Sequence, residues 1–507
     1  MKPGAPADSL VPGEAIPAGM ASSTHSERSE RHADLGRASH IPTSERIPLL
    51  QKIMFSVGGC TELLATGLLV MVWMPYFNIG MGISTTLLGA IMMVFTIWNA
   101  ILDPILGNIS DNARTRWGRR RPFLVVGAVL TGILFPLFWH MPAGFGEAGR
   151  IAYLLAVGFV FYICFSSWAM PYYGLQLELT PNYDERTRLT MWMTLFAKLG
   201  ALGAGWTLAI LTGPWFINPA TGKGDIVIGM RTACWFIAGG IILFGVLPAI
   251  FTKERYYKVE ASRQPREPFW QSVRESAGCK PLWGLIAISS FIVFGSTAIM
   301  SLSQYVQIYH LFDGDLSAAA ILFGWRGSVL TIAGILLIPF WTWLGERFDK
   351  RTVVMCMVVF MAFGHLLYFF CLRPEMPYLT LVPAFFESGA FSAIWLFIPS
   401  MKADAADYDE LHTSRRREGS INSFYSVMLK VAISGATGLG GLVLDLSGFT
   451  AKLGHQPPEV LQRMIWVFLL LPIAFWGAAL VVAYYYPLSR LHMAEIRERL
   501  EARRGKI

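Results

Sequence analysis

The sequence predicts an all-α membrane protein of about twelve transmembrane helices arranged as two six-helix bundles. Of its 507 residues, 54% are hydrophobic and 15% are charged, and the mean hydropathy is +0.47. Charged residues make up about a quarter of an ordinary soluble protein, so this composition indicates a membrane protein. Apolar runs of about 20 residues recur along the chain, each long enough to cross roughly 30 Å of hydrocarbon. A polar, basic stretch near the middle divides these runs six and six.

The stretch before the first apolar run is polar and rich in Gly, Ser, Pro and Ala. It has no apolar segment of the kind that a signal peptide needs. We therefore expect residues 1–47 to form a disordered cytoplasmic tail.

Each apolar run predicts one helix. The N-terminal bundle is expected at 48–252 and the C-terminal bundle at 281–487, with a cytoplasmic loop at 253–280 between them. Residues 488–507 read as a basic amphipathic helix that lies on anionic lipid. The predicted spans are 53–79, 84–110, 122–141, 150–178, 189–213, 229–251, 281–309, 316–344, 352–372, 377–401, 418–446 and 463–486.

Positive charge lies mainly in the connections that follow even-numbered spans and in the C-terminal tail. By the positive-inside rule, both termini and the middle loop are cytoplasmic. The net charge of +8 therefore reflects orientation in the membrane, and no nucleic-acid partner is expected. The six cysteines form no CxxC pair, so neither a metal site nor a disulfide framework is predicted. No cofactor is expected either.

A short motif follows span 2 and recurs after span 8. It reads GNISD in the first half and GERFD in the second, with the same separation from glycine to aspartate, which indicates a duplicated bundle. Arginines follow each aspartate. They either fix the orientation only, or pair with the carboxylates across the cytoplasmic interface in one conformation and release them in another. The candidate gating residues are Asp111, Arg119, Arg120, Arg121, Arg186, Asp349 and Arg351.

Few ionisable residues lie well inside the spans. A charge at the bilayer centre costs about 2.5–3.5 kcal/mol on insertion scales, so such residues normally face the bundle interior and pair. Asp103 is either a packing carboxylate or a cation or proton site that a lysine can also neutralise. Three acids and three bases allow pairing without identifying the pairs: Glu62, Asp103, Glu387, Lys198, Arg326 and Lys430, with His365 as either a bundle histidine or a proton relay.

Aromatic residues accompany these charges. Trp395 follows Glu387 by eight residues and lies on roughly the same helix face, and Tyr173 lies in span 4. Sugar rings stack on flat apolar faces while charged groups hold their hydroxyls, so this combination suits a sugar site. Aromatic rings are also common anchors at membrane interfaces.

With these residues in view, the sequence resembles the glycoside-pentoside-hexuronide:cation symporter family of the major facilitator superfamily. The resemblance runs from about residue 50 to 486 and depends on three motifs: DPILGNISDNARTRWGRRRPF at 103–123, PYYGLQLELTPNYDERTRL at 171–189 and ADAADYDELHTSRRREGSINSFYSVMLK at 403–430. It implies alternating access by two bundles around a central sugar site, with a coupled cation near span 2.

The resemblance also implies roles for single residues. Asp103 and Ser166 are similar to cation-site residues of the family, and Lys430 to the lysine between its cation and sugar sites. Asn99 stands where the family has a further aspartate. Because a sodium site needs several oxygen ligands, this departure favours a proton over sodium.

Some of the substrate contacts that the resemblance implies match the family's residues, and others differ from them. Tyr173 takes the place of a sugar-stacking tryptophan, Trp395 matches a tryptophan of helix 10, and Arg186 resembles an arginine at the start of helix 5. The family's sugar-binding aspartate of helix 4 appears as Ala169, and its helix-5 arginine aligns with Thr194. The substrate-contact candidates are Glu62, Tyr173, Lys198, Arg326, Glu387 and Trp395.

The sequence therefore predicts an inner-membrane transporter, monomeric by default, that imports a glycoside, a pentoside or a sugar acid with a proton or sodium. Its partners would be a small sugar and membrane lipid. A lipid or lysophospholipid carrier and an uncoupled sugar facilitator remain alternatives of the same fold. A membrane-embedded enzyme or a receptor is a remote alternative, since no HExxH motif occurs and the charges lie in both halves.

Overall fold

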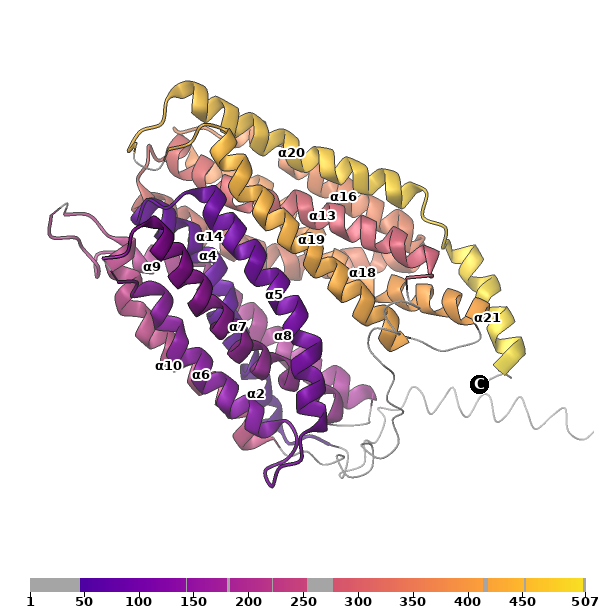
Figure 1. Cartoon of the computed structure of the whole chain (residues 1–507). Coiled ribbons are helices and arrows are strands. Elements are labelled where there is room, and N and C mark those ends of the chain that lie inside the picture. Colours follow the sequence, from indigo (N-terminus) through magenta and orange to yellow (C-terminus); the bar gives the residue numbers. More distant parts are fainter. Residues whose placement is uncertain are drawn as a thin grey trace, which may run out of the picture.

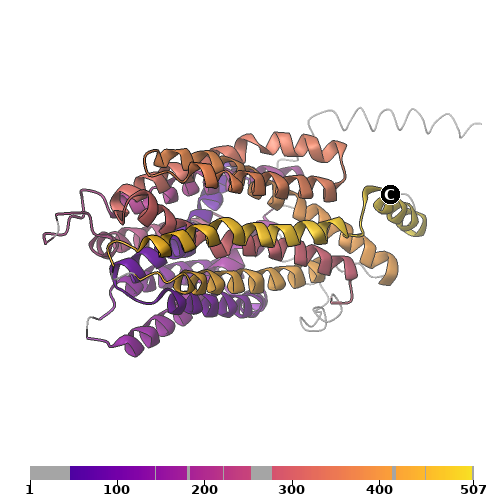
Figure 2. The same ribbon diagram turned by 90° about the horizontal axis from the view of Figure 1, so that it is seen from above.

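The computed structural model describes residues 46–142, 144–179, 183–220, 222–252, 277–413, 418–450 and 453–504. Most of the predicted N-terminal tail and of the predicted middle loop lies outside these ranges. The described chain is a set of long helices running in roughly one direction, with the C-terminal helix beyond their end (Figures 1 and 2).

The first span is built from short helical segments that follow one another without a loop. Two of them are π-helical, and the second begins at Pro75, which has no N–H for a regular helical bond. The segments are α2 (Leu49–Val57), α3 (Gly59–Glu62), η1 (Leu63–Gly67), α4 (Leu68–Met74) and η2 (Pro75–Gly80).

The remaining helices of the N-terminal bundle are long and mostly unbroken. They are α5 (Thr85–Asn112), α6 (Arg121–Trp139), α7 (Glu147–Glu178), α8 (Tyr183–Gly205), α9 (Thr207–Leu211) and α10 (Ile226–Phe251). The α8–α9 break falls at Trp206 and leaves one continuous span.

The C-terminal bundle repeats this plan and ends in a separate helix. Its elements are α13 (Lys280–Val306), η3 (Gln307–Leu311), α14 (Leu316–Leu336), α15 (Ile338–Arg347), α16 (Lys350–Leu366), α17 (Tyr368–Cys371), η4 (Pro377–Thr380), α18 (Leu381–Thr413), α19 (Glu418–Leu446), α20 (Pro458–Tyr484) and α21 (Arg490–Arg504).

Eleven helices among the described residues are long and apolar enough to cross a membrane, and α18 covers the remaining predicted span. The prediction of an all-α membrane protein of about twelve helices is confirmed. The helix that contains the predicted tenth span extends beyond residue 401, because α18 continues to Thr413. Its acidic end is stabilised by burial and pairing, as in the ion pair of Lys350 with Asp404 at 2.6 Å.

The predicted C-terminal amphipathic helix is α21. Its apolar side chains Met493, Ile496 and Leu500 are buried in the core of the C-terminal bundle. These three side chains therefore contact protein, whereas Leu491 at the start of the helix is 81% exposed, and the expected contact of α21 with anionic lipid stays a prediction.

The apolar core shows how the bundles meet. One cluster joins most of the N-terminal core to C-terminal residues such as Tyr305, Phe323 and Phe449, whereas the rest of the C-terminal core forms a second cluster. We call the end where α21 and Arg490 lie the basic end, and the end where Ser84 and Asp445 lie the opposite end. The C-terminal members of the first cluster lie toward the opposite end, and the helices of the two bundles diverge toward the basic end (Figure 1).

Candidate functional site

Four polar side chains from both bundles meet where α5 packs against α19. The Asn99 amide donates to Ser166 Oγ at 2.8 Å and lies 3.4 Å from Asp103 Oδ1. Lys430 Nζ donates to Asn99 Oδ1 at 3.1 Å and forms an ion pair with Asp103 Oδ2. All four residues predicted for coupling therefore form one group, the coupling cluster: Asn99, Asp103, Ser166 and Lys430.

The position of the coupling cluster follows from small residues on the two helices that carry it. Gly89 and Gly441 face each other so closely that a Cβ on Gly441 would lie 3.1 Å from the Gly89 Cα and 2.4 Å from the Thr85 carbonyl oxygen. Such glycines let two membrane helices approach. Asp103 is buried and the Lys430 side chain is 30% exposed, so the lysine keeps a route to water from within the interface.

A second polar pair lies beside the coupling cluster in the N-terminal bundle. The Tyr173 hydroxyl donates to Glu62 Oε2, and Tyr173 is 39% exposed. Glu62 also lies close enough to Lys430 for the two charges to interact. Two candidate substrate contacts thus adjoin the candidate cation site.

The charges inside the C-terminal bundle form a group of their own, which we call the Arg326 network. Arg326 Nη2 lies 3.3 Å from Glu387 Oε2, and its Nη1 donates to Ser303 Oγ at 2.8 Å. The other Glu387 oxygen lies 2.7 Å from His365 Nδ1. These side chains come from α13, α14, α16 and α18, and all of them are largely buried.

Six ionisable residues, apart from His365, were predicted to lie inside the spans. Four of them belong to the Arg326 network or the coupling cluster: Asp103, Arg326, Glu387 and Lys430. Glu62 bonds to a tyrosine, and Lys198 is half-buried on α8. Among the described residues, no carboxylate lies within ion-pair distance of Lys198. Lys198 is therefore the candidate base without a described acidic partner.

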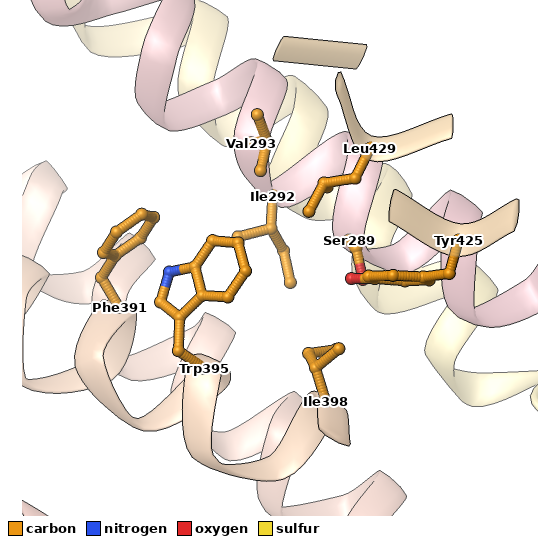
Figure 3. A pocket seen from close by; sticks show the side chains of 8 residues that line it. All are labelled: Ser289, Ile292, Val293, Phe391, Trp395, Ile398, Tyr425 and Leu429. Carbon is orange, nitrogen blue, oxygen red and sulfur yellow. The ribbon is translucent and has the colours of Figure 1, made fainter. Parts of the chain in front are cut away.

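Trp395 and Glu387 contact different groups of residues. It lines a small apolar pocket between α13, α18 and α19, where its ring faces Phe391, Ile292 and Leu429 (Figure 3). Trp395 is 45% exposed. The eight-residue spacing thus did not bring Trp395 into the Arg326 network.

The predicted gating residues of the first half gather beside Asp111. Arg120 donates to Asp111 Oδ1 at 2.7 Å, and Arg119 donates to the Asp111 carbonyl at 3.2 Å. Arg120 lies against Gly174, where a Cβ would come within 1.7 Å of Nη1. Arg121 donates to the carbonyl oxygen at the end of α10, Ala249 O, at 2.5 Å.

The gating residues of the second half make different contacts. Asp349 Oδ1 accepts from the backbone N–H of Arg490 at 3.0 Å, which ties α21 to the bundle. Arg351 donates to the carbonyl oxygens of Tyr484 at 3.2 Å and Tyr486 at 3.1 Å. Arg186 is exposed on α8. The sequence repeat therefore occupies equivalent places in the two halves without making equivalent bonds.

The sequence did not identify Asp445, which joins the bundles at the opposite end. Its carboxylate accepts from Ser84 Oγ at 3.0 Å, from Thr86 N at 3.0 Å and from the Thr85 hydroxyl. Asp445 thus caps the start of α5 from the other bundle, and we call this group the Asp445 clasp. An acid that closes an apolar span, together with a Ser-Thr-Thr helix start, was the available signal.

Glu185 was also missed, although its neighbour Arg186 was singled out. Glu185 is fully buried and accepts from Lys52 Nζ at 2.6 Å and from the Ile47 N–H at 2.8 Å. It therefore ties the start of α8 to the start of the first span. A buried acid in a charged loop sequence gives no periodic signal, because its partners lie far away in the chain.

The chain is similar in sequence and in fold to known transporters. The chain is 25% identical to a putative glycoside/cation symporter of Escherichia coli, over 83% of this chain and 87% of the relative. It is 22% identical to a sodium-dependent lysophosphatidylcholine symporter of Danio rerio, over 88% of each chain. A solved bacterial homologue of the lysosomal transporter Spinster, inward-facing and unoccupied, has the same fold, with a TM-score of 0.60 at 13% identity over 89% of this chain and 97% of the other.

The family model described as MFS/sugar transport protein matches residues 54–490, which include both bundles, the coupling cluster and the Arg326 network. This chain is a multi-pass membrane protein and belongs to the MFS/sugar transport protein family.

Proposed function

We propose that the protein is a secondary active transporter that imports a glycoside, a pentoside or a sugar acid together with a cation. It would act as a monomer in the inner membrane, with both termini in the cytoplasm. The observation that carries the proposal is the bond of Lys430 to Asp103, because it joins a charge of one bundle to a charge of the other. The E. coli relative named as a glycoside/cation symporter supports the same class of function.

The ion pair gives a physical route to coupling. Lys430 neutralises Asp103 while the bundles are in contact around the coupling cluster. A proton or a metal cation on Asp103 removes the need for the lysine, so cation binding and the ion pair exclude each other. The cation therefore changes the relative stability of the bundle arrangements, which is what symport requires.

The side-chain oxygens favour a proton over sodium. Once Lys430 has turned away, Asp103, Asn99 and Ser166 supply one carboxylate, one amide oxygen and one hydroxyl oxygen, and the hydroxyl oxygen already accepts from the Asn99 amide. Sodium needs several oxygen ligands at once. A proton needs only the Asp103 carboxylate, which Lys430 can release by turning toward water.

The substrate would bind between the bundles near the coupling cluster. Glu62 and Tyr173 are the first proposed contacts, since they bond to each other and the charge of Glu62 interacts with that of Lys430. Lys198 is suited to a carboxylated sugar, since no acidic partner for it lies among the described residues. Arg326, Glu387 and Trp395 complete the proposed set.

Uptake into proteoliposomes tests the coupling. A panel of labelled glycosides, pentosides and uronides is offered under an imposed pH gradient or sodium gradient, to the wild type and to Asp103→Asn. Accumulation driven by the pH gradient, with the variant only equilibrating its substrate, supports proton symport through Asp103. Asp313→Asn is the control, since Asp313 is exposed and pairs only with His455 among the described residues. Equal accumulation by wild type and Asp103→Asn removes the coupling role.

Lys198→Met tests the substrate class in the same assay. Loss of uronide uptake with unchanged uptake of a neutral glycoside supports a carboxylate contact at Lys198. Equal losses for both substrates reject it.

A lysophospholipid is the second candidate substrate, because the Danio rerio relative is named for one and matches over the same length of chain. A labelled lysophospholipid added to the panel decides between the two classes. Accumulation of the lipid without accumulation of any sugar replaces the sugar proposal.

A further inference from the structure

The His365 imidazole lies between two hydrogen-bond acceptors, the side-chain carboxyl group of Glu387 and the backbone carbonyl of Phe468. Its Nδ1 is 2.7 Å from Glu387 Oε1, and its Nε2 is 2.9 Å from the carbonyl oxygen of Phe468. A neutral imidazole has one N–H and one bare nitrogen. It therefore cannot donate to both of these oxygens.

The Phe468 carbonyl is available because of the sequence of α20. In a regular helix the carbonyl of residue 468 accepts from the N–H of residue 472, and Pro472 has no N–H. His365, which is fully buried, supplies the missing donor from α16. A backbone carbonyl cannot donate in return, so Nε2 must carry a hydrogen.

The proton count of the pair then follows. With Nε2 protonated, the contact between Nδ1 and Glu387 needs one more proton, held either by the histidine as an imidazolium or by the glutamic acid. Without it, a bare ring nitrogen faces a carboxylate oxygen at 2.7 Å in a buried site, which is repulsive. The bonds therefore account for one exchangeable proton.

The groups around the pair include one fixed cation and several uncharged side chains. Arg326 from α14 contacts the other oxygen of Glu387 at 3.3 Å, so the carboxylate is already bound to one cation. From α17, Tyr368 contacts His365 edge-on and interacts electrostatically with Arg326, Glu387 and Cys371. From α20, Phe468 and Trp476 cover the ring and carry no charge. Ser303 and Gln307 complete the polar wall from α13 and η3.

We propose that the C-terminal bundle holds a proton on the His365–Glu387 pair, at a binding site separate from Asp103. The site lies within one bundle and contains its own fixed cation, Arg326. Together, Arg326, Glu387 and His365 would carry a net charge of +1 with this proton and zero without it. The inference does not depend on the substrate or on Asp103, so it stands or fails separately from the proposed symport.

Nitrogen NMR of the histidine-labelled protein in lipid nanodiscs at neutral pH tests the proposal. We expect either both ring nitrogens of His365 to be protonated, or a protonated Glu387 carboxyl in the infrared spectrum; both outcomes place one proton on the pair. His365→Gln assigns the nitrogen signal and Glu387→Gln the carboxyl band. A cross-peak between the ring and a carbon-13-labelled glutamate carboxyl assigns the pair if either variant fails to fold.

Glu387→Gln is also expected to convert the His365 ring to the neutral form with a single N–H. His310 is the matched control, since its Nε2 contacts only one oxygen, the Leu372 carbonyl at 3.3 Å, among the described residues. His310→Gln should leave the spectrum of His365 unchanged. A neutral His365 ring beside an ionised Glu387 in the wild type would overturn the proposal.

Discussion

The coupling cluster and the Arg326 network contain the same kinds of groups, but they differ in what they join. Lys430 and Asp103 come from different bundles, whereas Arg326, Glu387 and His365 all come from the C-terminal bundle. If the bundles rock against each other, the first pair separates and the second keeps its contacts. Charges between the bundles can therefore report a conformational change, while charges within one bundle stabilise that bundle and set its proton content.

Removing Arg326 is expected to have the largest effect on stability. Arg326→Met leaves Glu387 buried with less positive charge around it, and breaking a buried pair from one side costs about 3–5 kcal/mol. Thermal unfolding of the purified protein measures the loss. Asp313→Asn is the control, because the side chains of Asp313 and His455 are 81% and 76% exposed in their pair, and an exposed pair is worth about 0–1 kcal/mol. Equal unfolding temperatures for the two variants would contradict the difference between buried and exposed pairs.

Removing Lys430 is expected to affect transport more than stability. The Lys430 side chain is 30% exposed, so water can enter and solvate Asp103 when the lysine is gone. Lys430→Met should abolish accumulation, and adding Asp103→Asn should recover stability with a coupling energy of about 0.5–3 kcal/mol. Thermal unfolding of the two single variants and the double variant measures this energy. Additive effects would show that the two side chains do not interact across the bundles.

The contact of α5 with α19 can be broken by size alone. Gly441→Val places side-chain atoms against the Thr85 carbonyl, and overpacking of this kind costs about 1–3 kcal/mol. We expect the variant to populate a conformation in which the opposite end is open. Spin labels at the exposed positions 145 and 450, which flank a hollow of about 540 Å³ at this end, should move apart. Gly477→Val, where a Cβ meets nothing within 4 Å, should leave that distance unchanged.

Much of this molecule could be predicted from its sequence. Spans are local features, since twenty apolar residues in a row need no knowledge of the rest of the chain. The members of the coupling cluster were also predictable, because each is a polar residue inside a span or matches a family motif. What the sequence left open was the pairing, since Asp103 and Lys430 are separated by 327 positions in the chain.

The missed residues share a physical cause. Asp445 and Glu185 lie at span ends, where a charged residue is ordinary, and only the distant partners at Ser84 and Lys52 make them unusual. His365 was visible, but its role depends on a carbonyl that Pro472 leaves without a helical donor. That signal is present in the sequence as a proline inside a span, although nothing local indicates which side chain uses the carbonyl.

The smallest effect is expected at the Asp445 clasp, which also joins the two bundles. Asp445→Asn keeps the shape of the side chain but removes the charge that accepts from Ser84 Oγ, the Thr85 hydroxyl and Thr86 N. Because loss of a helix cap costs about 0.5–2 kcal/mol and the amide keeps one acceptor oxygen, we expect about 1 kcal/mol. Since 1.4 kcal/mol is about tenfold, the open population at the opposite end should rise about fivefold.

The spin-label distance at positions 145 and 450 measures this shift, and Asp313→Asn controls for the loss of an acid at the same end. The expected order is that Asp445→Asn opens this end less than Gly441→Val, because the variant loses a bond without introducing a clash. An Asp445→Asn variant that opens the end as far as Gly441→Val would mean that the clasp, and not the packing of α5 on α19, holds the bundles together there. The inter-bundle contact would then depend on charge at both of its ends, at Asp445 as well as at Lys430.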